Sequence, residues 1–486
     1  MASPTDSMTE RPMMNDNMGT EQDNNTNGSG AMSDTSVARE EKTPDPKPAA
    51  SVDGGYGWVC VFATFLINCH TFGINSSFGV FLAYYIENDK FPGATNLQYA
   101  FIGGLSISCA LLISPLVTYI TRTFGTKYTL GLGVILETIS FIGASFASRT
   151  WHLFLSQGIC FGFGMGLLFL GSVGIIPQWF VKRRGLANAL GSSGSGIGGL
   201  VYNLAVQAML KSVGLAWTFR ILAIIVFVTC VFSTIIIRDR NKAIGASQMV
   251  FDVTLFKRVE YLMILAWGFL SILGLIVLLF SLPNYANYIG LTPNQGAVVG
   301  AVLNLGQGIG RPIVGFASDK TGRMNGAGFF TFLTGLFCLV VWIFAKSYGV
   351  LIFFALIVGL VCGTFWATIA PVAAEIVGLK HLASALSINW LVLVAPATVS
   401  EAIALQLSST GYLHAQIYVG FIYIGAALFI WPLRAWKLGQ MEMAAAEQGK
   451  TLREVDAMQV NGTNAATTGA TPSSSFVRRL FIWKKV

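Results

Sequence analysis

The sequence predicts an all-α polytopic membrane protein in which twelve helices cross the bilayer as two six-helix pseudo-repeats. Three observations predict this fold class. Of the 486 residues, 53% are hydrophobic and only 11% are charged, whereas a soluble domain carries about 25% charged residues. The apolar residues form twelve runs, each long enough to cross a hydrocarbon core of about 30 Å. Two short motifs also recur in the second half of the chain.

The twelve predicted spans alternate with short loops. In chain order they cover residues 57–86, 97–120, 127–148, 151–180, 186–211, 216–237, 258–288, 294–317, 325–346, 348–378, 383–408 and 412–434. A central loop at 238–257 therefore separates a six-helix bundle at 53–237 from a second bundle at 258–434.

Both ends of the chain differ from this apolar middle. Residues 1–52 carry nine acidic and four basic side chains and have no apolar period, which predicts a disordered tail. Residues 435–486 are expected to form a second tail whose last residues are basic and aromatic. One set of alternate loops holds thirteen Lys and Arg residues and the opposite set holds four. Because positive loops stay inside, both termini are expected in the cytoplasm, with the plasma membrane favoured over the vacuole.

The repeat is visible in two pairs of segments. Residues 115–125 (PLVTYITRTFG) precede residues 312–322 (PIVGFASDKTG) by 197 positions, and the proline, valine and glycine coincide. Residues 186–190 (LANAL) precede residues 382–386 (LASAL) by 196 positions. Two matches at nearly one offset predict six helices used twice, an arrangement typical of transporters that rock two repeats about a central site.

Several other classes of site are excluded. All seven cysteines lie in apolar runs without CxxC spacing, so neither a metal site nor a disulfide framework is predicted. The glycine cluster at 191–199 lacks the Gly-Lys-Ser/Thr ending of a phosphate loop and lies in a predicted span, where small residues favour close helix packing. Four scattered histidines form no catalytic group, so no enzyme and no cofactor is expected. The basic residues lie in membrane loops, which indicates a lipid bilayer and not nucleic acid as the partner.

A gating motif follows the predicted eighth span. The segment 310–323 (GRPIVGFASDKTGR) resembles the loop signature of the major facilitator superfamily, and its predicted gating residues are Gly315, Asp319, Lys320, Gly322 and Arg323. A glycine lets two helices approach, and the acid and arginine can form a charge relay with a neighbouring helix end. The alternative is a solvated loop with the positive-inside bias. In the first-half copy, Arg122 stands where Asp319 stands in the second.

A second set of motifs narrows the resemblance. Residues 53–58 (DGGYGW) resemble the opening motif of the monocarboxylate transporter family, and the likeness continues through 182–188 (KRRGLAN) and 374–380 (AEIVGLK). It covers roughly residues 53–434. The segments 371–379 and 384–390 look most like the fungal branch of that family.

The resemblance singles out Arg311 as a substrate residue. An arginine at this motif position is implicated in holding the substrate carboxylate in the animal family members, and a bidentate contact gives the chemical reason. The alternative is an arginine that snorkels to the membrane surface. Proton-coupled members carry an acid one turn earlier and a lysine in the first span, but this chain has Gln307 and Ser76 there. Proton coupling through those two positions is therefore not expected.

Other polar and aromatic residues of the predicted spans are candidates for the same cavity or for helix-to-helix hydrogen bonds. Candidate substrate residues are Asn75, Ser76, Asn304, Gln307, Arg311, Trp366, Asn389 and Trp390. The two tryptophans could line a cavity for a planar ligand or belong to the core. Candidates for proton coupling are Glu401, Glu375 and Glu137, because burial in lipid raises the pKa of a carboxyl.

These observations predict a transporter that moves a small organic solute by alternating access. The solute could be a carboxylate, a vitamin such as riboflavin, or an exported secondary metabolite. A membrane receptor that keeps the same fold and senses solute is the alternative. The sequence predicts neither the cargo, nor the direction of flux, nor the oligomeric state.

Overall fold

The computed structural model describes residues 53–91, 93–241, 252–409, 411–448 and 476–481. The predicted N-terminal tail at 1–52 lies outside the described residues, as do half of the central loop and most of the C-terminal tail. All regular structure in the described residues is helical, without a strand, so the predicted fold class is confirmed.

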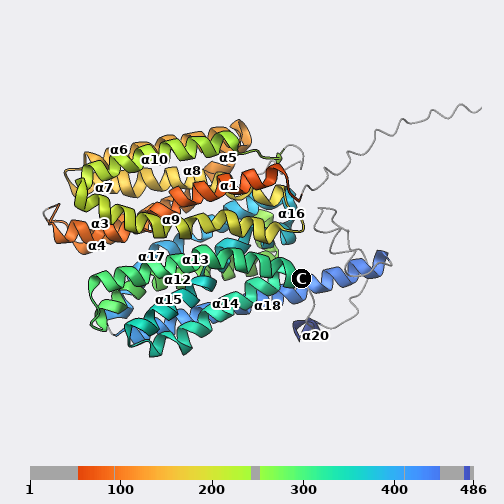
Figure 1. The fold of residues 1–486 in the computed structure, drawn as a ribbon. Coiled ribbons are helices and arrows are strands. Elements are labelled where there is room, and N and C mark those ends of the chain that lie inside the picture. The colour runs from red at the N-terminus through yellow and green to blue at the C-terminus, as the bar shows by residue number, and fades with distance from the viewer. Residues whose placement is uncertain (1–52, 92, 242–251, 410, 449–475, 482–486) are drawn as a thin grey trace, which may run out of the picture. The chain divides into compact units, whose positions relative to one another are not determined.

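The first half of the chain forms six spans from shorter helical pieces (Figure 1). These are α1 (Tyr56–His70), α2 (Phe72–Asn75), α3 (Phe78–Glu87), α4 (Asn96–Leu112), α5 (Ser114–Phe124), α6 (Thr126–Ser145), α7 (Thr150–Leu153), the π-helix η1 (Phe154–Cys160), α8 (Phe161–Val173), the 3₁₀ turn η2 (Ile176–Gln178), α9 (Arg184–Ser212) and α10 (Gly214–Ile236). Breaks such as Thr71 and Ile113 interrupt a span without ending it.

The second half repeats this plan. It contains the 3₁₀ helix η3 (Val253–Lys257), α12 (Val259–Tyr288), α13 (Pro293–Thr321), α14 (Arg323–Val340), the 3₁₀ turn η4 (Trp342–Phe344), α15 (Tyr348–Cys362), α16 (Thr364–Val392), α17 (Val394–Ser409), α18 (Tyr412–Gln448) and α20 (Phe476–Phe481). Figure 1 shows α9 and α13 side by side where the two halves meet.

Nine helices of the described chain are long and apolar enough to cross a membrane. The number is ten if the bent pair 101–112 and 114–124 is counted as one span. Two further spans, one missed by this criterion and one counted together with its neighbour, bring the ten to the predicted twelve. The helix α9 has 29 residues, enough to cross a bilayer, but its glycines and serines lower its hydropathy. The stretch Tyr348–Ser408 has 61 residues, about twice the length of one span.

That long stretch turns back at Gly378. The glycine has φ 76° and interrupts α16, and a positive φ is a conformation that suits glycine. The ring centroids of Trp366 and Trp390 lie 5.5 Å apart with an interplanar angle of 12°. An uninterrupted helix would separate residues 24 positions apart by about 36 Å. The chain therefore reverses between them, and the predicted spans ten and eleven are distinct.

Small residues allow the two halves to touch backbone to backbone. A methyl group at Gly196 of α9 would overlap the backbone of Gly308 on α13, and one at Gly315 would overlap Ala189 and the backbone of Gly185. The cluster at 191–199 is thus a helix-packing surface, as the sequence indicates.

The C-terminal boundary differs from the expectation. The predicted tail begins at 435, but α18 continues as a helix to Gln448. The indole Nε1 of Trp431 donates a hydrogen bond of 2.7 Å to the carbonyl of Leu480 in α20, and Arg479 forms an ion pair of 3.9 Å with Glu442. Side-chain contacts with α20 hold this extension, whereas hydropathy alone ends the span at the membrane surface.

Candidate functional site

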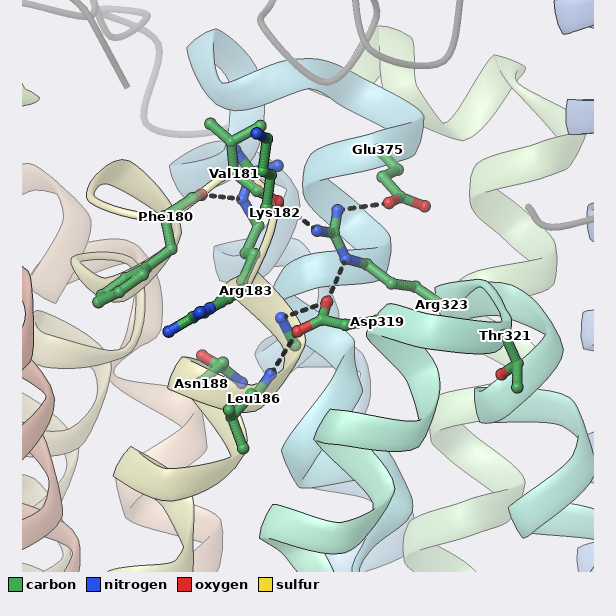
Figure 2. A network of polar contacts seen from close by, with 12 residues as sticks. Phe180, Val181, Lys182, Arg183, Leu186, Asn188, Asp319, Thr321, Arg323 and Glu375 are labelled. Atoms are coloured by element: carbon green, nitrogen blue, oxygen red, sulfur yellow. Dashed lines mark hydrogen bonds and ion pairs between the residues drawn. The ribbon is translucent and has the colours of Figure 1, made fainter. Parts of the chain in front are cut away.

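An ion-pair cluster joins the two halves at the end of the bundle that carries the basic loops, which we call the basic end (Figure 2). Asp319 lies near the end of α13. Its Oδ1 accepts a hydrogen bond of 2.9 Å from the backbone N–H of Gly185, and its Oδ2 accepts one of 2.8 Å from that of Leu186. These N–H groups belong to the first turn of α9, where the helix dipole favours negative charge. One half of the protein therefore caps a helix of the other half.

Arg323, at the start of α14, ties this cap to a third helix. Its Nε lies 3.2 Å from Asp319 Oδ1 and its Nη1 lies 2.5 Å from Oε1 of Glu375 on α16. Its Nη2 donates a hydrogen bond of 2.6 Å to the carbonyl of Val181. The ion-paired side chains are about 10% exposed or less, so each charge depends on its partners for solvation. We call Asp319, Arg323, Glu375 and the first turn of α9 the latch.

The other predicted gating residues have different roles. Gly322 has φ 108° and ends α13, and Gly315 faces Ala189 and Gly185 of α9, where a side chain would not fit. Lys320 lies with its Nζ 4.3 Å from the ring centroid of Phe316 on its own helix. The glycines therefore shape the latch, while Lys320 lies beside it.

The loop before α9, where the carbonyl of Val181 accepts a hydrogen bond from Arg323, is also hydrogen-bonded to the motif at residues 53–58. Asp53 Oδ1 accepts hydrogen bonds of 2.8 Å from the N–H of Val181 and 2.9 Å from that of Lys182. Arg184 is 1% exposed, and its Nε donates a hydrogen bond of 2.8 Å to the carbonyl of Phe180. Neither Asp53 nor Arg184 is among the site residues predicted from the sequence. For Asp53, the signal in the sequence is its position as an acidic residue directly before a pair of glycines.

Arg311 lies deeper in the interface between the halves. It is 6% exposed, and its Nη1 donates a hydrogen bond of 2.5 Å to the carbonyl of Ser192 and another to the hydroxyl of Ser195, both on α9. Its Nη2 donates one of 2.9 Å to Gln307 Oε1. Within the described residues, no carboxylate lies within ion-pair distance of the guanidinium, and its Nε has no hydrogen-bond partner.

Two of the other candidates, Ser76 and Asn304, meet about two turns from Arg311 toward the start of α13. The hydroxyl of Ser76 and the carboxamide of Asn304 both face Gly199 of α9. Ser76 donates to the carbonyl of Phe72 at 2.9 Å, and Asn75 accepts a hydrogen bond of 2.8 Å from the hydroxyl of Ser106. Asn75, Ser76 and Asn304 thus lie at the contact of α2, α9 and α13 and the neighbouring α4.

The predicted tryptophans form the centre of an aromatic cluster that spans both halves. Trp366 and Trp390 stack on each other, and Phe169 of α8 lies 5.7 Å and 5.5 Å from them between ring centroids. Phe72 of α2 lies 5.4 Å from Trp366. Asn389 is 1% exposed, and its amide atoms have no hydrogen-bond partner among the described residues.

The three acidic candidates lie in different surroundings. Glu375 belongs to the latch as a counter-ion of Arg323. Glu137 on α6 is fully buried, and neither of its oxygens has a hydrogen-bond partner among the residues the structure describes. The side chain of Glu401, on α17, lies outside the described residues. Whether any of them carries a proton stays a prediction.

Comparisons with known proteins agree with this architecture. The family profile described as "Major Facilitator Superfamily" matches residues 60–267 and again 264–483. The chain is 35% identical to "Probable transporter MCH2" of Saccharomyces cerevisiae over 408 residues, which are 81% of this chain and 86% of that protein. It is 32% identical to "Uncharacterized transporter ESBP6" of the same yeast, over 79% of this chain and 60% of that protein.

Relatives from filamentous fungi also align over most of the chain. The "Fujikurins efflux protein" of Gibberella fujikuroi is 26% identical over 82% of this chain and 85% of its own length. These names are those of transporters and efflux proteins, which supports transport of small organic solutes and gives no support to a solute sensor. With two matched repeats, twelve spans and the latch at the motif 310–323, the chain belongs to the Major Facilitator Superfamily and is a multi-pass membrane transporter.

Proposed function

We propose that this transporter moves an organic anion by alternating access, with the latch as its inner gate and Arg311 as the contact for the anion. The observation that carries the proposal is the cap of α9 by Asp319, which joins the two halves through groups that separate together. When the halves rock apart at the basic end, water can solvate each of these groups. The latch is therefore a reversible closure, unlike an apolar seam.

Arg311 supports the anion assignment through its lack of a counter-ion in the described chain. A guanidinium inside a membrane protein is costly unless a partner or a polar cavity compensates it. Its present partners, the carbonyl and hydroxyl oxygens of Ser192 and Ser195 and the amide oxygen of Gln307, are all uncharged. A solute carboxylate would supply the missing charge with a bidentate contact.

The names of several relatives and the loop charges support export from the cytoplasm as the direction of transport. Several relatives of similar architecture are named as efflux proteins. The basic end lies in the cytoplasm under the positive-inside rule, so the latch is a cytoplasmic gate and both termini are cytoplasmic. We place the transporter in the plasma membrane, where export is effective. Gln307 and Ser76 cannot carry protons, so coupling to a proton gradient requires another acid.

Flux in proteoliposomes tests the anion assignment. Labelled carboxylates and their neutral alcohol analogues are compared in the wild type, Arg311→Ala and Arg311→Lys, with and without a pH gradient. Arg220→Ala is the matched control, since Arg220 stacks on Phe146 and Trp217 away from the site. We expect Arg311→Ala to abolish carboxylate flux and Arg311→Lys to retain part of it. Carboxylate flux that is unchanged in Arg311→Ala would refute the assignment.

A further inference from the structure

A large cavity opens at the basic end, on the side of the bundle where the first-half copy of the gating motif lies. It has a volume of about 730 Å³. The first half contributes α5, the start of α6, the end of α8 and residues 239–241, and the second half contributes the part of α16 that follows Gly378. The cavity therefore lies at an interface between the two halves.

The repeat explains why this side is open. Asp319 closes its own side because its carboxylate caps the first turn of α9. In the first repeat, Arg122 stands at the position that Asp319 has in the second. In the second repeat, the helix that corresponds to α9 begins near Leu382. Arg122 and Leu382 both line the cavity. An arginine cannot cap a helix N-terminus, since both carry positive charge. The repeat position that holds the capping carboxylate on one side therefore holds an arginine beside the cavity on the other.

The mouth of the cavity favours an anion. Arg122 and Arg240 line it, together with the acidic Asp239. Arg240 lies 5.3 Å above the ring centroid of Trp179, which fixes its position. The N-terminal end of the helix after Gly378 adds partial positive charge to the same wall.

The inner end of the cavity is apolar and aromatic. Leu170 and Trp390 line it, and Trp390 stacks on Trp366 within the aromatic cluster. Cavities of roughly 300–1,000 Å³ hold ligands of drug size. A three- or four-carbon monocarboxylate would leave most of the volume empty, whereas a fused-ring carboxylate is closer to the size of the cavity.

We propose that this cavity is the loading site for a bulky aromatic organic anion, with its acidic group beside Arg122 and Arg240 and its ring system against Trp390. This proposal rests on the proposed function, which places the mouth of the cavity on the cytoplasmic side, where the anion would enter. It adds the class of cargo and a site separate from Arg311.

Binding to the full-length protein in lipid nanodiscs tests this site without relying on flux. The probes are labelled naphthalene-2-carboxylate, with naphthalene-2-methanol and lactate as competitors. The variants are Arg122→Ala, which removes charge, and Ala383→Trp, which fills the cavity from an exposed lining position. The matched control is Arg149→Ala in an exposed loop segment between α6 and α7, and thermal unfolding checks that each variant is folded.

We expect both cavity variants to weaken naphthalene-2-carboxylate binding by about ten- to hundredfold, the loss typical of one hydrogen-bonded charged contact, and Arg149→Ala to bind like the wild type. The neutral alcohol and lactate should compete poorly. If binding is lost in Arg311→Ala but unchanged in both cavity variants, this inference is wrong and the proposed function stands. An absence of naphthalene-2-carboxylate binding, or equal competition by lactate, would overturn the assignment of cargo class.

Discussion

Replacing Asp319 by asparagine removes the negative charge that caps α9 while keeping the size of the side chain. In the closed latch this carboxylate accepts two backbone N–H bonds, of 2.9 Å and 2.8 Å, and pairs with Arg323 at 3.2 Å. A hydrogen bond to a charged group contributes about 1.5–3 kcal/mol, against about 0.5–1.5 kcal/mol for a neutral pair. Asparagine can accept through only one oxygen, and its NH₂ group faces the other N–H.

The two weakened caps and the lost ion pair together amount to about 3 kcal/mol of closed-state stabilisation. The ratio of open to closed protein at the basic end should therefore rise about 150-fold. Because the substitution acts on one conformation, its effect on the equilibrium should exceed its effect on global unfolding. The change is large enough to convert a minor open population into a major one.

Distances between spin labels at Lys182→Cys and Thr321→Cys measure this opening. Both positions are exposed and lie on opposite sides of the latch (Figure 2), and the seven native cysteines are buried or half-buried. We expect double electron–electron resonance to show a longer distance population in Asp319→Asn. The matched control is Lys320→Gln, an exposed neighbour that stacks on its own helix. Identical distance distributions in the wild type and Asp319→Asn would refute the capping argument.

Three further substitutions test other parts of the structure. Gly315→Ala places a methyl group against Ala189, an overlap that costs about 1–3 kcal/mol. The same spin labels should therefore report a more open basic end, and an unchanged distance distribution would contradict the close approach of α9 and α13. Glu137→Gln replaces a buried carboxyl that lacks a hydrogen-bond partner in the described chain, so the melting temperature should stay level or rise, whereas a fall of several degrees would indicate a stabilising contact. Arg122→Asp should create a cap at the second helix end and weaken aromatic anion binding, and unaltered binding would contradict the role of the repeat.

The sequence predicts the latch in part, because charged residues leave a pattern and backbone groups do not. Asp319 and Arg323 stand out as opposite charges four residues apart in the motif 310–323. Their partners across the interface include the N–H groups of Gly185 and Leu186. Every residue but proline has such a group, so only the fold shows which of them meet a carboxylate.

Glu375 illustrates a second limit. Apolar residues surround it in the sequence, which made a membrane-buried proton carrier one interpretation. The structure pairs it with Arg323 at 2.5 Å, because the turn at Gly378 brings the end of the tenth span to the basic end. The location of a charge along a span depends on where the span ends, and sequence-based boundaries are uncertain by two to four residues.

The repeat has one further consequence for how the gate works. Two equivalent caps would share the stabilisation of the closed state, and loss of one would leave the other in place. Here Asp319 provides a cap on one side, whereas Arg122 stands at the corresponding repeat position on the other, so among the described residues the repeat supplies one carboxylate cap and not two. If the cargo is the proposed organic anion, Arg122 and Arg240 would lie beside it at the interface that the proposed gate controls. An anion bound between Arg122 and Trp390 would touch both halves, and its binding energy could then favour one arrangement of the halves over the other.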